Sequence, residues 1–280
     1  MYFLPGFVQI HHLWRPGPAL SPAREGASRG QYRIHAAKEK YAGRLLPAMI
    51  GTAAVEVEAT TVEVRPTDVR RIPQPGEAYD LVEIETDRGT TFCRYYEAEG
   101  ARDGLVMVGG TGGGFDTPGR ELYPRLAKDL KNDRISTLRV RYRHPADLVE
   151  STVDTVLGLR YLESRGVRAI GLVGHSFGGA VVIQAAASDP AVRAVVAIST
   201  QEAGTGPVAE LAGRAAVFLV HGDADPVIPH RSSEEVYRRA GEPKRLVIYE
   251  GADHILDEVA ESLYVEVKAW LLKHLPGTLV

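Results

Sequence analysis

The 280-residue chain contains a single cysteine, Cys93, so no disulfide can form within it. The segment around it, TTFCRYY, is rich in β-branched and aromatic residues and favours a strand. No glycine-flanked pattern of the kind found around nucleophilic cysteines surrounds it. We therefore expect Cys93 to be a buried apolar residue, in a chain suited to a reducing compartment.

The sequence also lacks long apolar runs. No stretch of about 18 apolar residues occurs, which excludes a membrane-spanning helix. The apolar start, MYFLPGFVQIHHLWRPGP, has no basic residue before it and is interrupted by two histidines, so we expect no secretory signal. These features predict a soluble, cytoplasmic protein without a membrane partner.

Neither sign of charge dominates, because the chain has 33 lysine and arginine residues and 36 aspartate and glutamate residues. We therefore expect no nucleic acid partner. The glycine-rich segment GGTGGG (109–114) lacks the Lys-Ser/Thr ending of a phosphate-binding loop and the spacing of a dinucleotide fingerprint. His11 and His12 have no partner at metal-ligand spacing. We therefore expect no cofactor and no metal.

Residues 1–50 differ in composition from the rest of the chain. They contain five prolines and no sustained helical or strand periodicity. We interpret them as an irregular extension and residues 51–280 as one domain. The extension could be an arginine-rich targeting segment, an arm that folds over the domain, or sequence upstream of a start at Met49. Organellar targeting therefore stays an alternative to the cytoplasm.

The rest of the sequence predicts an α/β fold. Three β-like runs, VEVEATTVEV, YDLVEIET and TTFCRYYEA, are separated by RRIPQPGE and DRG and predict antiparallel strands at a sheet edge. Further on, apolar runs such as GLVMV and AIGLVG alternate with helical segments, in the first of which Thr117 is expected to cap a helix starting at Pro118. This alternation predicts a mostly parallel central sheet flanked by helices, with sites at the carboxyl ends of its strands.

One such strand end carries a serine. Ser176 lies in LVGHSFGG (172–179), directly after the strand AIGLV and before a segment rich in alanine and valine. A strand-to-helix turn this tight forces its middle residue into a strained conformation, which only glycine neighbours leave room for. The pattern G-x-S-x-G alone is weak evidence, but in this position it predicts an exposed nucleophile.

A serine hydroxyl is a poor nucleophile without a base and an orienting acid. The strand AVFLVHG is followed by Asp223 and Asp225, and the last strand, RLVIY, is followed by Asp253 and His254. The order serine, aspartate, histidine along the chain is the order expected for this type of turn.

From about residue 80 to residue 275 the chain resembles an α/β-hydrolase, through the segments GGTGGG, GHSFGG, HGDADPVIP and GADH. The resemblance implies Ser176 as the nucleophile, His254 as the general base and Asp225 as the acid that orients the imidazole. Asp223, in the turn, is expected to accept backbone N–H groups instead, and Asp253 to cap the following helix.

The resemblance also implies two backbone donors for an oxyanion. The first is the N–H of Phe177, next to the nucleophile, and the second comes from the glycine loop, at Thr111 or Gly112. The family often has a histidine where this chain has Gly109.

The segment between the strand that ends near Ser199 and the strand that begins at Ala215 is about 15 residues long, too short for an inserted cap domain. In this respect the chain resembles the lidless dienelactone-hydrolase and prolyl-oligopeptidase-like branch, although the dienelactone enzymes have cysteine where this chain has Ser176. The resemblance implies a serine hydrolase, a carboxylesterase that cleaves a small acyl substrate with water through an acyl-enzyme. A thioesterase, an acyl-peptidase and a perhydrolase use the same triad. A non-catalytic ligand-binding protein of this fold is the alternative from another class.

The strand LRVRYRHP places Arg139, Arg141 and Arg143 on alternate positions. Two interpretations stay open. The arginines point past the sheet edge or pair with carboxylates, or Arg143, nearest the carboxyl end, reaches the site and favours an acidic or polar acyl substrate.

Overall fold

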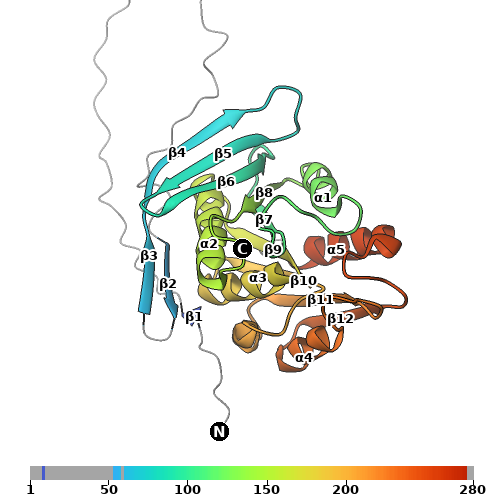
Figure 1. Cartoon of the computed structure of the whole chain (residues 1–280). Helices are drawn as coiled ribbons and strands as arrows, with labels where there is room; N and C mark the ends of the chain where they lie inside the picture. The colour runs from blue at the N-terminus through green and yellow to red at the C-terminus, as the bar shows by residue number, and fades with distance from the viewer. Residues whose placement is uncertain (1–7, 10–52, 58–59, 276–280) are drawn as a thin grey trace, which may run out of the picture.

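The computed structural model describes residues 8–9, 53–57 and 60–275 of the chain. Their main feature is a nine-stranded sheet with the order β12-β11-β10-β9-β7-β8-β6-β5-β4 (Figure 1). Its strands are β4 (Pro66–Pro73), β5 (Asp80–Thr86), β6 (Gly89–Tyr96), β7 (Asp103–Val108), β8 (Ile135–Arg141), β9 (Ala169–His175), β10 (Val192–Ile198), β11 (Ala216–Gly222) and β12 (Lys244–Tyr249).

The sheet is parallel from β8 through β7 and β9 to β12, and antiparallel from β4 through β5 and β6 to β8. Every residue of β9 and of β11 is buried, as expected for central strands covered on both faces. The prediction of a mostly parallel sheet with antiparallel strands at its N-terminal edge is confirmed.

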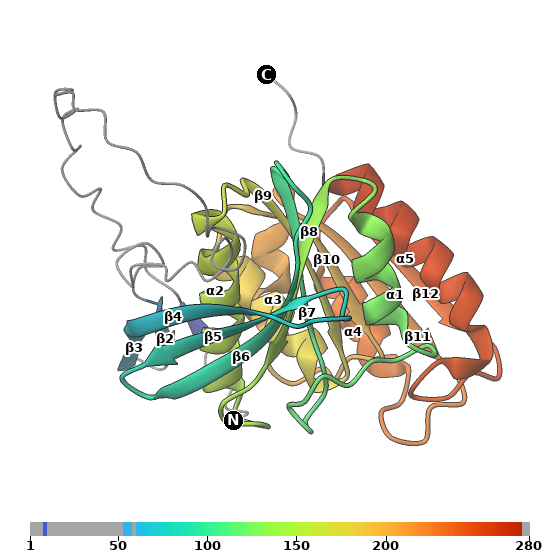
Figure 2. The same ribbon diagram turned by 90° about the horizontal axis from the view of Figure 1, so that it is seen from above.

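Helices cover both faces of the sheet (Figures 1 and 2). On one face, α2 (Leu148–Ser164), α3 (Phe177–Ser188) and α4 (Arg231–Arg239) pack over one hydrophobic core. On the other face, α1 (Leu122–Leu130) and α5 (Ala260–His274) pack over a second one. Cys93 is buried in the first core, and burial raises the pKa of its thiol, so it stays an apolar neutral group.

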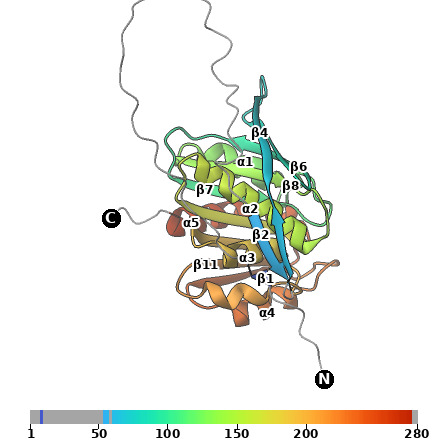
Figure 3. The same cartoon turned by 90° about the vertical axis from the view of Figure 1, so that its left-hand side faces the viewer.

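Two details of the N-terminal part differ from the sequence prediction. The strands β2 (Ala53–Val57) and β3 (Thr60–Val64) form a separate small sheet with β1 (Val8–Gln9), which contacts α2 and α3 (Figure 3). The segment RRIP, interpreted as a break, forms the end of β4. Proline is compatible with β4 because β4 is an edge strand and Pro66 and Pro73 are its terminal residues. Apart from Val8–Gln9, the predicted extension over residues 1–50 lies outside the described residues.

Helix α1 begins later than predicted, at Leu122 rather than Pro118. Its N-cap, Glu121, has a left-handed backbone and no side-chain cap bond. Thr117 still satisfies one amide of the first turn, because its hydroxyl accepts a hydrogen bond from the Tyr123 N–H at 2.9 Å. The glycines before the helix therefore continue into a longer irregular segment than the sequence suggested.

The connection from β10 to β11 holds only the short 3₁₀ helix η2 (Gly206–Leu211), so no cap domain is inserted there. This confirms the lidless architecture expected from the length of the connection. None of the helices in the described residues combines the length and the apolar character needed to cross a bilayer.

The antiparallel edge of the sheet is tied to α2 by a buried cluster of charges. Arg143, whose side chain is 2% exposed, donates from Nε to Asp154 and from Nη2 to Glu150 at 2.9 Å. Its Nη1 donates to the carbonyl of Arg88, whose own side chain pairs with Glu150. Thr91 of β6 donates to Asp154 at 2.5 Å. The structure therefore supports pairing with carboxylates for Arg143, and its guanidinium nitrogens are not left for a substrate.

We predict that Arg143→Met lowers the free energy of unfolding by about 3–5 kcal/mol, because it leaves buried carboxylates without their partner. Urea unfolding followed by circular dichroism measures the change. Arg238→Met, which removes the exposed pair with Glu235, is the matched control and should leave the unfolding midpoint unchanged. Equal midpoints for the two variants would show that the buried cluster does not stabilise the fold.

Candidate active site

Ser176 occupies the turn between β9 and α3. Its backbone has φ 58° and ψ −120°, a strained conformation for a residue with a side chain. The flanking glycines are required by close backbone contacts. A Cβ at residue 174 would lie 2.1 Å from the Gly178 carbonyl oxygen, and one at residue 178 would lie 2.3 Å from the Gly109 carbonyl oxygen. The turn thus holds Ser176 at the carboxyl end of the central strand, half-buried.

Two loops at the same edge of the sheet bring an aspartate and a histidine together. Asp225 follows β11 and His254 follows β12, and His254 Nδ1 donates to Asp225 Oδ2 at 2.7 Å. The Asp225 side chain is fully buried, whereas that of His254 is 13% exposed. Because Nδ1 carries the proton, Nε2 of the neutral imidazole is the nitrogen free to accept one.

Asp225 is held as a carboxylate by several donors. Its Oδ1 accepts the backbone N–H groups of Val227 at 2.7 Å and Ile228 at 2.9 Å. Burial alone would raise the pKa of Asp225, but the hydrogen bonds from Ile228, His254 and Val227 outweigh burial and keep the pKa below its usual range. An ionised acid in a fixed orientation is what an imidazole base requires.

The other acidic residues near His254 have separate roles. Asp223 accepts the Gly251 N–H at 2.7 Å, and Asp253 accepts the Ile255 and Leu256 N–H groups at 2.8 and 3.0 Å. Asp223 binds the backbone, as its place in the turn suggested. Asp253 binds two amides of the turn before the 3₁₀ helix at Asp257–Val259, whose N-cap is Leu256, so it does not cap that helix as predicted. Among the acidic residues that the structure describes, Asp225 alone forms a hydrogen bond with the His254 ring.

His175, the residue before Ser176, links the turn to His254. Its Nε2 donates to the His254 carbonyl at 2.9 Å, and the two rings lie 4.8 Å apart. Burial lowers the pKa of His175 to about 4, so the ring is neutral near pH 7. Ser176 and His254 are thereby close in space, although Ser176 Oγ makes no hydrogen bond to another described residue. Such bonds are commonly long without substrate.

His221 is a second partner of Asp225. Its Nε2 faces Asp225 Oδ2 at 3.0 Å and the Ile228 carbonyl at 2.9 Å, both acceptors, so this nitrogen is the donor. Its Nδ1 accepts from the Ser233 hydroxyl of α4 at 2.7 Å. Burial lowers the pKa of His221, which favours this neutral form. The sequence gave no signal for the contact between His221 and Ser233.

The glycine loop approaches the serine from the next strand, β7. A Cβ at residue 110 would lie 3.5 Å from Ser176 Cβ, so the backbone of Gly110 passes directly beside the serine. The Gly113 N–H donates to the Gly110 carbonyl at 3.1 Å and closes a turn. Thr111 and Gly112, the two residues expected to supply a backbone donor, are the exposed middle residues of that turn.

The structure thus gathers Ser176, Asp225, His254, the Phe177 amide and the glycine loop at one edge of the sheet. Arg143 instead belongs to the ion-pair cluster with Asp154 and Glu150. Within the described part of the chain, no group of three or more histidine, cysteine, aspartate or glutamate side chains is placed to hold a metal ion.

This combination of sheet order, turn and loops is the α/β-hydrolase fold. A sequence profile of the Dienelactone hydrolase family matches residues 115–269, more than half of the chain. The chain therefore belongs to the dienelactone hydrolase family, and it is a hydrolase. No curated protein matches its sequence significantly.

Solved structures of hydrolases share the fold. A dienelactone hydrolase from Anabaena variabilis has 19% identity and a TM-score of 0.61, over 71% of this chain and 100% of that one. The esterase domain of a Rhodothermus marinus protein has 17% identity and a TM-score of 0.56, over 69% and 98%. Est1E from Butyrivibrio proteoclasticus has 16% identity and a TM-score of 0.56, over 73% and 98%.

We predict that the free energy of unfolding falls as the pH is lowered from about 6.5 towards 4, in part because of His175. The unfolded chain binds a proton on His175 in this window and the folded chain does not, so acid favours unfolding. His175→Gln should make this pH dependence shallower, and His230→Gln, at an exposed position, should not change it. Urea unfolding between pH 4 and pH 7 tests both, and an unchanged slope in His175→Gln would contradict the prediction.

Proposed function

We propose that the protein is a serine hydrolase that cleaves a carboxylic ester of modest size through an acyl-enzyme. Ser176 is the nucleophile, His254 the general base and Asp225 the orienting acid. The observation that carries the proposal is the 2.7 Å hydrogen bond from His254 Nδ1 to the buried Asp225, beside a serine held in a strained strand-to-helix turn.

The chemistry follows from this arrangement. Ser176 Oγ attacks the acyl carbonyl carbon while His254 Nε2 takes the hydroxyl proton, and the imidazolium then gives that proton to the leaving alcohol. Water, with its proton taken by His254, then attacks the acyl carbon, and the imidazolium returns that proton to Ser176 Oγ as the acyl–serine bond breaks and the carboxylic acid is released. Asp225 fixes the tautomer of the neutral imidazole and stabilises the imidazolium when it forms.

The charge that develops on the carbonyl oxygen needs donors in place beforehand. The Phe177 N–H is the first, because it follows Ser176 and belongs to the first turn of α3, where amides have no partner within the helix. The second is the N–H of Thr111 or Gly112, in the turn beside Ser176. Loss of one such donor in a comparable enzyme costs about 2.7–4 kcal/mol.

The architecture favours a small substrate or the exposed end of a larger one. No cap covers the strand ends between β10 and β11, and His254 and Ser176 are partly accessible. The partners are therefore an acyl compound and water. A thioester, an acylated peptide or a peracid reaction would use the same residues, and a comparison of p-nitrophenyl esters with acyl-CoA thioesters separates the first two.

A non-catalytic ligand-binding protein is the rival from another class. A pure binder has no need for a buried ionised acid, an imidazole fixed by it and a strained serine at one place. We predict that a fluorophosphonate probe labels the protein at Ser176, and that Ser176→Ala abolishes labelling and ester turnover with an unchanged unfolding midpoint. Mass spectrometry of the labelled peptide identifies the site, and a folded protein that stays unlabelled would favour the binder.

The assignment of the acid is tested by two amide substitutions. We predict that Asp225→Asn lowers kcat on the order of 10³–10⁴-fold with KM nearly unchanged, because the amide favours the wrong imidazole tautomer. Asp223→Asn is the matched control and should mainly lower the unfolding midpoint, since Asp223 binds the Gly251 amide. Loss of activity in a folded Asp223→Asn with retention in Asp225→Asn would show that the acid is wrongly assigned.

A further inference from the structure

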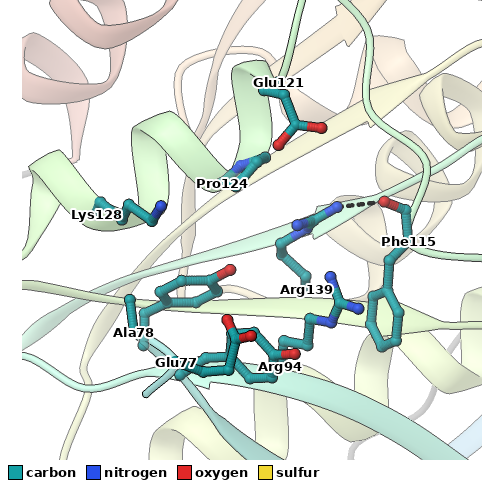
Figure 4. A pocket seen from close by; sticks show the side chains of 10 residues that line it. Glu77, Ala78, Arg94, Phe115, Glu121, Pro124, Lys128 and Arg139 are labelled. Carbon is teal, nitrogen blue, oxygen red and sulfur yellow. Dashed lines mark hydrogen bonds between the residues drawn. The ribbon is translucent and has the colours of Figure 1, made fainter.

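A hollow lies on the α1 side of the sheet, and Ser176 is not among the residues that line it. It has a volume of about 200 Å³ and is bounded by β6, β8, α1 and the segment between β4 and β5 (Figure 4). This volume is below the ~300–1,000 Å³ of typical drug-sized sites, so it suits a small molecule. Its walls combine aromatic rings with three cationic side chains; the aromatic residues are Tyr79, Tyr96 and Phe115, and the cations are Arg94, Lys128 and Arg139.

Arg139 is the buried cation of this hollow, with a side chain from the middle of β8 and a residue exposure of 3%. Its Nη2 donates to the Phe115 carbonyl, as Figure 4 shows. Its Nε is buried and has no hydrogen-bond partner. A buried charged donor without a partner is costly, so a missing acceptor is expected next to it.

Arg94 and Lys128 add two further positive charges to the lining of the hollow. The Arg94 guanidinium lies between two rings, 4.9 Å from the centre of Tyr79 and 4.3 Å from that of Phe115. Neither Arg94 nor Lys128 forms an ion pair with a described residue. In the neighbouring hollow the situation is the opposite, because Arg71 donates to Asp80 at 2.6 Å and to Glu97 at 2.8 Å.

Two carboxylates, Glu77 and Glu121, also line the hollow, and both residues are exposed. Three cations against two carboxylates leave one positive charge. The balance favours a ligand with a single negative charge over a multiply charged phosphate. The aromatic walls favour a flat or apolar body attached to that charge.

We propose that this hollow binds a small aromatic carboxylate. The carboxylate accepts from Arg94 and lies beside the Arg139 guanidinium; both side chains present planar donor groups suited to carboxylate oxygens. The ring of the ligand lies against Tyr96 and Phe115. Lys128, an exposed residue of α1, adds a positive charge.

The hollow is separate from the proposed catalytic site. Arg139 of β8 is aligned with Met107 of β7, and Met107 is aligned with Val173 of β9. Val173 therefore lies two strands away from Arg139, and it precedes Ser176 by three residues. With strands about 4.8 Å apart and residues about 3.3 Å apart along them, Arg139 and Ser176 are on the order of 14 Å apart. The proposal therefore does not rest on the proposed function, although Phe115 connects the hollow to the end of the glycine loop.

The test is isothermal titration of the full chain with benzoate, its neutral isostere benzamide, and inorganic phosphate. We expect benzoate to bind saturably at one site, and benzamide and phosphate to bind about tenfold more weakly or not at all. Arg94→Gln and Arg139→Lys should each weaken benzoate binding about tenfold or more. Arg141→Gln is the matched control, an arginine on the same strand that does not line the hollow, and should bind benzoate like the wild type.

Thermal unfolding of each variant separates loss of the site from loss of the fold, and Arg94→Gln, only partly buried, is the substitution expected to keep the midpoint. Equal binding of benzoate and benzamide would overturn the proposal, as would benzoate affinity within about twofold of wild type in folded Arg94→Gln. Phosphate binding as tight as benzoate would show a simple anion site and overturn the aromatic carboxylate.

Discussion

The backbone contacts around Ser176 determine much of the remaining arrangement. Residue 174 packs against the Gly178 carbonyl and residue 178 against the Gly109 carbonyl, and neither position has space for a Cβ. The first contact closes the turn between β9 and α3 and forces Ser176 into its strained backbone. The second holds the start of the glycine loop against α3. The proposed nucleophile and the proposed oxyanion donors are therefore positioned by one set of contacts between main chains.

The proposed base and acid are positioned largely by hydrogen bonds of their side chains. Asp225 receives hydrogen bonds from two backbone amides and two imidazoles, and His221 in turn contacts Ser233 of α4. His254 is held at its ring by Asp225 and at its carbonyl by His175. The network is buried at the acid and becomes accessible towards the base, which suits an acid that stays ionised and a base that must reach substrate and water.

The sequence could predict the parts of this site that depend on local geometry. The glycines around Ser176, the strand ends before Asp225 and His254, and the short connection before β11 all follow from residues near one another in the chain. The partners of Arg143 could not be predicted in this way, because Asp154 and Glu150 are on the next helix and Arg88 comes from a hairpin more than fifty residues earlier. The same holds for Ser233, which contacts His221 from α4. It also holds for the small sheet of β1 to β3, because β1 pairs with β2, which is distant in sequence.

Three histidines near one carboxylate raise the question of which one carries charge. Burial lowers the pKa values of His175 and His221. The Nε2–H group of each ring donates a hydrogen bond to a backbone carbonyl, which fixes the tautomer of the neutral ring. His254 is the more accessible ring. If His175, 4.8 Å away, were protonated near pH 7, it would oppose a positive charge on His254, since like charges at that distance in a partly buried site interact strongly. Burial of the two neighbours thus leaves the negative charge of Asp225 available to His254, the histidine proposed to become an imidazolium during the reaction.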